Sequence, residues 1–159
     1  MPPIAISEQV GAAPWTPAPG PAGQPRGAHG QPPTLADMLP AAHLASRPVD
    51  VEIGADFDIV VLPEKQARRT VDLLAHCRPH PVGAAVSRPG EWVLFLPPRS
   101  GLGTHWPRPA THYDSGTLQV PPVLTVCDGL RWARLGNAGR YGRFYTAPLM
   151  VHPLLPLLG

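Results

Sequence analysis

Proline is the residue that most constrains this chain, because it fixes φ and removes a backbone hydrogen-bond donor. The sequence holds 24 prolines and 16 glycines in 159 residues, and eleven of the prolines lie within the first 48 residues. A segment of this composition has little apolar surface to bury and cannot offset the entropy of ordering. We therefore expect residues 1–48 to be a disordered Pro/Gly-rich tail, with a short helix over 34–44 capped by Thr34.

The strongest strand signal follows this tail. Residues 57–62 (Phe-Asp-Ile-Val-Val-Leu) are nearly continuously apolar and rich in β-formers, which predicts a central strand buried on both faces. Pro63 ends that strand and opens a helix that we expect to run to about His76. The apolar face predicted for this helix has the spacing i, i+4, i+7, i+8 and consists of Ala67, Val71, Leu74 and Ala75.

Shorter strand signals occupy the rest of the domain, between Pro- and Gly-rich breaks. The predicted strands cover 82–86, 92–96, 117–120 and 130–134, with a loop from 97 to 116. This order predicts an α+β domain over 49–135, a small and mostly antiparallel sheet with one main helix on one face. Residues 136–159 read as a low-order C-terminal segment, first rich in Arg and aromatics and then in Pro and Leu.

Cysteine content and the lack of a signal-peptide pattern favour a cytoplasmic protein. The net charge is +2, and Lys65 is the only lysine among the 13 basic residues. Cys77 and Cys127 form neither a disulfide framework nor a metal-binding set. The N-terminus lacks the pattern of a signal peptide, and the apolar stretch 149–158 is short and broken by proline. We therefore expect no membrane partner.

Several segments, taken in order, resemble the bifunctional DNA primase/polymerase (prim-pol) N-terminal domain. They are the run 54–64 with the helix after it, the strand 92–96, and the later Gly-Thr-Leu-Gln-Val-Pro-Pro of 116–122 followed by 128–132. The resemblance covers roughly residues 50–134. It implies a palm-like sheet related to the RNA-recognition motif, and a template-copying reaction that uses a metal-bound nucleotide.

The family's catalytic ligands do not carry over in that register. Its acid-x-acid pair falls on Val61 and Pro63, its histidine near Val93, and its later acid near Arg108. The resemblance thus implies a domain that has lost catalysis and needs no cofactor.

An active metal-dependent nucleotidyltransferase stays open as an alternative. Asp56 and Asp58 form their own acid-x-acid pair, which on a strand places two carboxylates on one face, as a bound Mg²⁺ or Mn²⁺ requires. His105 follows a glycine-rich lead-in, and Asp114 or Asp128 could supply the later acid.

Arginine and aromatic residues alternate near the C-terminus, a pattern typical of single-stranded nucleic-acid binding. The candidate contact residues are Arg131, Arg134, Arg140, Tyr141, Arg143 and Tyr145. A further alternative is a non-enzymatic interaction module whose Pro-rich tail binds a protein partner.

Overall fold

The computed structural model describes residues 30–101, 103, 105–136 and 143–158. Residues 1–29, most of the predicted tail, lie outside this part. The strands are β1 (Val49–Ile53), β2 (Asp58–Pro63), β3 (Ala84–Arg88), β4 (Glu91–Leu96), β5 (Thr111–Tyr113), β6 (Gly116–Val120) and β7 (Arg131–Leu135). The helices are α1 (Leu35–Met38), α2 (Pro40–Leu44), α3 (Glu64–Leu73), α4 (Pro148–Val151) and the 3-10 helix η1 (His152–Leu158).

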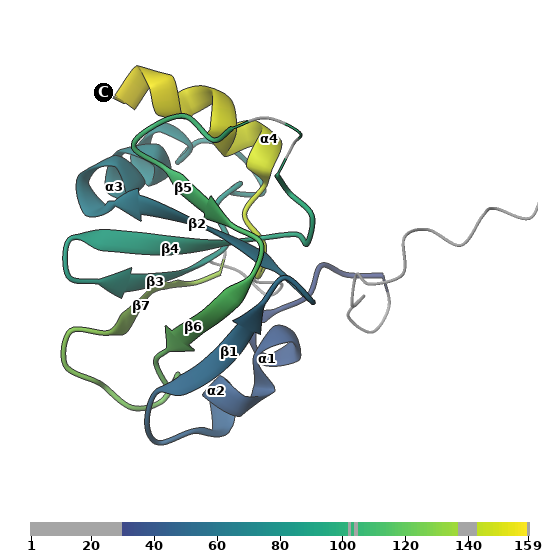
Figure 1. The fold of residues 1–159 in the computed structure, drawn as a ribbon, viewed down its shortest axis with the longest axis vertical. Helices are drawn as coiled ribbons and strands as arrows, with labels where there is room; N and C mark the ends of the chain where they lie inside the picture. Colours follow the sequence, from purple (N-terminus) through teal and green to yellow (C-terminus); the bar gives the residue numbers. More distant parts are fainter. Residues whose placement is uncertain (1–29, 102, 104, 137–142, 159) are drawn as a thin grey trace, which may run out of the picture.

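Five strands form the main sheet in the order β5-β2-β4-β3-β7, and every neighbouring pair is antiparallel (Figure 1). β1 and β6 pair separately as an antiparallel two-stranded sheet. The expected α+β class with a mostly antiparallel sheet and few helices is confirmed. β2 lies inside the main sheet, with β4 on one side and β5 on the other, as its apolar sequence predicts.

Both faces of the main sheet are covered, because alternate residues of the inner strands are apolar on each side. In β2, Ile59 and Val61 pack toward α1, α2, β1 and β6, whereas Val60 and Leu62 pack toward α3 and the C-terminal helices. Figure 1 shows these two layers on opposite sides of the sheet. The molecule therefore has two apolar clusters divided by one sheet.

Pro63 and the β3–β4 turn fix where α3 begins. Pro63 precedes the helix with φ −55°, and the first helical N–H, that of Glu64, donates to the Gly90 carbonyl at 2.9 Å. Gly90 adopts the positive φ of +79° that this turn requires. α3 ends at Leu73, three residues before the predicted end, and Ala75 is exposed rather than part of the buried face.

The domain begins earlier than residue 49, which corrects the predicted boundary. The segment 34–44 forms two short helices instead of one, because Pro40 cannot continue α1 and starts α2. Thr34 caps α1, and its backbone and side chain both contact Asp37. The apolar residues of this segment join the core: Leu35, Met38, Leu39 and Ala42. Strand β1, whose apolar residues alternate with acids, was not predicted.

The C-terminal segment was expected to be low-order, and for residues 143–158 that expectation is wrong. Val151, Leu155 and Leu158 are buried against α3 and the sheet. The prolines that argued against order lie within a 3-10 helix: Pro153 is in its first turn, where an N–H has no partner within the helix, and Pro156 is inside it. Among the described residues, no helix is long and apolar enough to cross a bilayer.

Two leucines of η1 provide a test of this packing. Leu155 is fully buried and Leu157 is 70 % exposed. We expect Leu155→Ala to lower the free energy of unfolding by about 2–5 kcal/mol, since it leaves a cavity between α3 and the sheet. Leu157→Ala should change it by less than about 0.5 kcal/mol. Urea unfolding followed by circular dichroism measures both, and equal small effects would show that η1 does not belong to the core.

Candidate functional site

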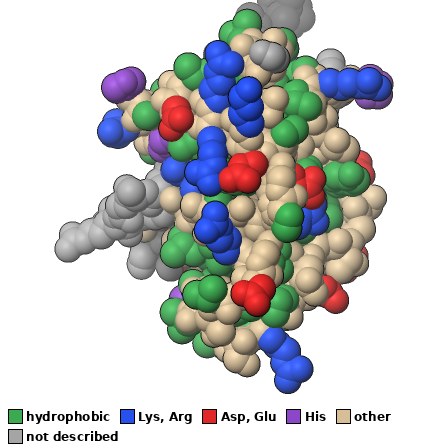
Figure 2. Space-filling view, turned by 90° about the vertical axis from the view of Figure 1, so that its left-hand side faces the viewer, with side chains coloured by type: hydrophobic (Ala, Val, Ile, Leu, Met, Phe, Trp, Pro, Cys, Tyr) green, Lys and Arg blue, Asp and Glu red, His purple; other side chains and the backbone are tan. Residues whose placement is uncertain are grey.

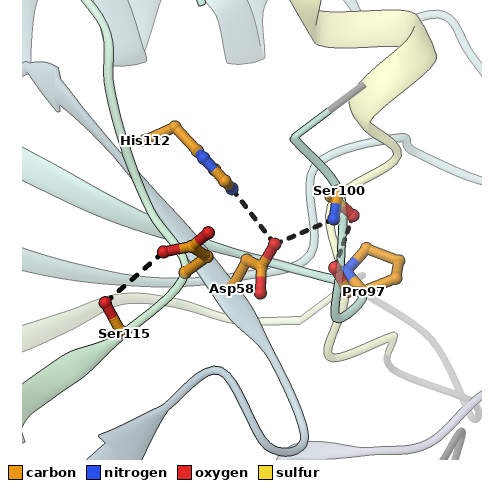
Figure 3. Close-up of polar contacts among 6 residues, drawn as sticks. Asp58, Pro97, Ser100, His112 and Ser115 are labelled. Carbon is orange, nitrogen blue, oxygen red and sulfur yellow. Dashed lines mark hydrogen bonds and ion pairs between the residues drawn. The ribbon is translucent and has the colours of Figure 1, made fainter. Parts of the chain in front are cut away.

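Asp58 is a buried acid at the start of β2, with a side chain 1 % exposed. Its Oδ2 atom accepts a hydrogen bond from the Ser100 backbone N–H at 2.8 Å, and His112 Nε2 lies 3.1 Å from the same atom (Figure 3). A buried carboxyl group is costly unless it is bonded in this way. Asp58 therefore ties the loop after β4 and strand β5 to β2.

His112 is the partner of Asp58 that the sequence did not reveal. It lies on β5, which the sequence analysis assigned to a loop, and its register opposite Val60 places it on the same face as Asp58. The His112 ring stacks on Trp106, with ring centroids 6.1 Å apart, and Trp106 meets His152 edge-on at 5.0 Å. The only local signal was the three-residue alternation Thr-His-Tyr, which is too short to predict a strand.

Asp56 and His105 do not join this cluster. Asp56 precedes β2 and is exposed, so the i, i+2 rule that would align it with Asp58 on one strand does not apply. His105 is exposed and makes no hydrogen bond or ion pair with another described residue. No group of three or more His, Cys, Asp or Glu residues that could hold a metal ion occurs in the described part of the chain.

The predicted Arg/aromatic set divides into three parts. Arg131 and Arg134 lie on the outer strand β7, where Arg131 is exposed. Arg134 is half-buried, its Nη2 donates to the Val82 carbonyl at 3.4 Å, and burial lowers the pKa of its guanidinium. Arg140 and Tyr141 lie outside the described residues. Arg131 is thus the exposed cation of β7, whereas the Arg134 guanidinium donates a hydrogen bond to a backbone carbonyl within the fold.

Arg143 and Tyr145 line a cleft of about 560 Å³ that joins the two ends of the described chain. We call it the proline cleft after its lining residues: Gly30, Gln31, Pro32, Pro33, Pro81, Pro97, Arg143, Tyr145, Thr146 and Ala147. The Phe144 N–H donates to the Pro33 carbonyl at 2.8 Å, which holds the N-terminal wall against the C-terminal one. The sequence grouped Arg143 with Tyr145 but gave no sign that prolines far away would face them.

Tyr145 is fixed at one wall of the proline cleft. Its hydroxyl donates to the Asp56 backbone carbonyl at 2.6 Å. Burial, together with the nearby Asp56 carboxylate, raises the pKa of Tyr145 to about 12. Gly83 permits this position, because a Cβ there would collide with the carbonyl oxygens of Phe144 and Tyr145. The phenol is therefore neutral and held in place at physiological pH.

A second concentration of basic side chains lies where α3 and the β3–β4 hairpin meet, at the left of Figure 1. Figure 2 shows Lys and Arg gathered on this face with Asp and Glu between them. Two of the cations are paired: Arg68 Nη2 with Glu64 Oε1 at 2.7 Å, and Arg88 Nη2 with Glu91 Oε1 at 2.6 Å. Interleaved acids weaken the attraction of such a face for a polyanion.

Comparisons of this chain with protein-family models, with curated proteins and with solved structures find no match. The prim-pol resemblance therefore depends on the sequence segments described above.

Asp58 can be tested as a structural acid. In Asp58→Asn the acceptor loses its charge, and hydrogen bonds to charged groups are the stronger ones. We expect the free energy of unfolding to fall by about 1–2 kcal/mol, measured by urea denaturation. Asp56→Asn removes the same charge at an exposed position and should change stability by less than about 0.5 kcal/mol. Similar losses in the two variants would contradict the role assigned to Asp58.

Tyr145 should titrate at a higher pH than an ordinary tyrosine. Absorbance at alkaline pH is expected to show one phenol ionising near pH 12, and Tyr145→Phe should remove that phase only. Because the folded-state pKa lies above the ordinary value of 10.0, the contribution of Tyr145 to stability is present below pH 10 and is lost as the pH rises toward 12. Loss of a phase near pH 10 in Tyr145→Phe would refute this environment.

Proposed function

We propose that this protein is a prim-pol-like domain without catalytic activity that binds single-stranded nucleic acid in the cytoplasm. The observation that carries the proposal is the position of Arg143 and Tyr145, which line one cleft together. A cation for phosphate and an aromatic wall for bases are the two elements of single-strand binding.

Charge supports a polyanionic ligand at this cleft. Arg143 is the only charged residue among the described residues that line it, and Asp56, the acid near its Tyr145 wall, is exposed to solvent. The whole chain carries a net charge of +2, which adds a weak, salt-sensitive attraction. The face formed by α3 and the β3–β4 hairpin is less suited to the same ligand, because its arginines are paired with Glu64 and Glu91.

The environment of Asp58 supports the non-catalytic part of the proposal. A metal-dependent nucleotidyltransferase needs carboxylate oxygens that face a bound cation. Here Asp58 Oδ2 already accepts from Ser100 and contacts His112, and Asp56 lies outside β2. We therefore propose no Mg²⁺ or Mn²⁺ cofactor.

Salt-dependent binding tests the proposal directly. Fluorescence anisotropy of the full chain with a labelled single-stranded oligonucleotide should give an affinity that falls as salt rises, because phosphate contacts release counterions. Arg143→Ala should lower the slope of log K against log[salt] by about 0.7, the contribution of one single-strand phosphate contact. Arg69→Ala removes the same charge at an exposed position on α3 and serves as the matched control.

Two outcomes would overturn the proposal. Absence of any salt-sensitive binding would rule out nucleic acid as the ligand and favour a protein-interaction module. Binding of a deoxynucleoside triphosphate that requires Mn²⁺ and disappears in folded Asp58→Asn would instead make the protein an active nucleotidyltransferase.

A further inference from the structure

The walls of the proline cleft carry unusually few hydrogen-bonding groups. Four of its lining residues are prolines, which have no backbone N–H: Pro32, Pro33, Pro81 and Pro97. Three of their carbonyls already accept a hydrogen bond within the fold: Pro33 from the Phe144 N–H at 2.8 Å, Pro81 from the Ala147 N–H at 2.8 Å, and Pro97 from the Ser100 hydroxyl. Most of the wall is thus apolar and is formed by the proline rings and the Tyr145 ring.

Two of the four polar side chains of the cleft, those of Tyr145 and Thr146, are engaged within the fold. Thr146 Oγ1 accepts from the Gly83 N–H at 3.1 Å, and the Thr146 N–H donates to the Phe95 carbonyl at 2.7 Å. The Tyr145 hydroxyl donates to Asp56. Arg143, in contrast, makes no hydrogen bond or ion pair with another residue in the described part of the chain. The cleft therefore offers apolar surface, the Arg143 cation and the exposed amide of Gln31.

A flat uncharged ring attached to an anion fits this combination. The volume of about 560 Å³ lies within the range of clefts that hold small organic groups. An apolar wall with a fixed aromatic side chain favours a nucleobase, and Arg143 favours a phosphate next to it. A proline-rich peptide would suit the apolar wall but would leave the cation without a counter-charge.

Building on the proposed function, we infer that the proline cleft receives one unstacked nucleobase of a single strand, with a neighbouring phosphate at Arg143, and does not distinguish among the four bases. Base identity is read through hydrogen bonds to base edges. Apart from the Gln31 amide, a wall of prolines with three of its four carbonyls already used supplies few such bonds, whereas every base presents a ring face. The cleft thus binds any of the bases with similar affinity.

The test uses the full chain and labelled strands of equal length at one salt concentration. Oligo-dT, oligo-dC and oligo-dA should bind with dissociation constants within about threefold of one another, since stacking tolerates any base. A strand of abasic deoxyribose phosphates of the same length should bind about tenfold more weakly, because it keeps the phosphates and loses the stacked base. Arg143→Ala should weaken all four strands by a similar factor.

Two variants at one position separate the ring from its hydroxyl. Tyr145→Phe keeps the aromatic wall and should preserve the tenfold difference between base-bearing and abasic strands. Tyr145→Leu should reduce that difference to less than about threefold. If Tyr145→Leu does not fold, the comparison of base-bearing with abasic strands on the unmodified chain decides the question by itself.

The results separate this inference from the proposed function. A preference above tenfold for one base, or equal affinity for base-bearing and abasic strands, would overturn the inference and leave nucleic-acid binding intact. No binding of any strand would overturn both. A proline-rich peptide that binds the cleft with an affinity unchanged by Arg143→Ala would also overturn the inference, because the occupant would then be a neutral peptide.

Discussion

A sheet that is apolar on both faces must be covered on both, and this requirement shapes the whole molecule. β2 sends Ile59 and Val61 to one side and Val60 and Leu62 to the other, all of them buried. One main helix can cover only one side. The other side is closed by α1, α2 and the β1–β6 pair, and the C-terminal helices complete the layer that α3 begins. Segments at both ends of the described chain are therefore part of the core.

The sequence predicted the elements whose signal is local. β2, α3 and β4 combine a run of apolar residues or a helical period with a proline or glycine at the boundary, and each lies within three residues of its predicted limits. β5 could not be predicted, because three residues become a strand only through pairing with β2. The proline content of residues 148–158 predicted low order, whereas Pro153 and Pro156 lie within a short 3-10 helix.

The candidate site shows the same division between local and distant information. Asp58 was recognised from its sequence pattern, but its neighbours Ser100 and His112 are 42 and 54 residues away in the chain. The grouping of Arg143 with Tyr145 was visible as a local motif, whereas the prolines facing them come from residues 32–33, 81 and 97. Spacing along the sequence identifies side chains that carry chemistry; the sheet register decides which of them meet.

The proline cleft has one wall from residues 30–33 and another from residues 143–147, so it brings together segments from near the beginning and the end of the described chain. A molecule bound there would bridge the two terminal segments of the domain. Its binding free energy would then oppose fraying of either end, because a ligand that binds only the folded state stabilises that state. Occupancy of the cleft would therefore hold residues 30–33 against residues 143–147 and slow the proteolysis of both segments.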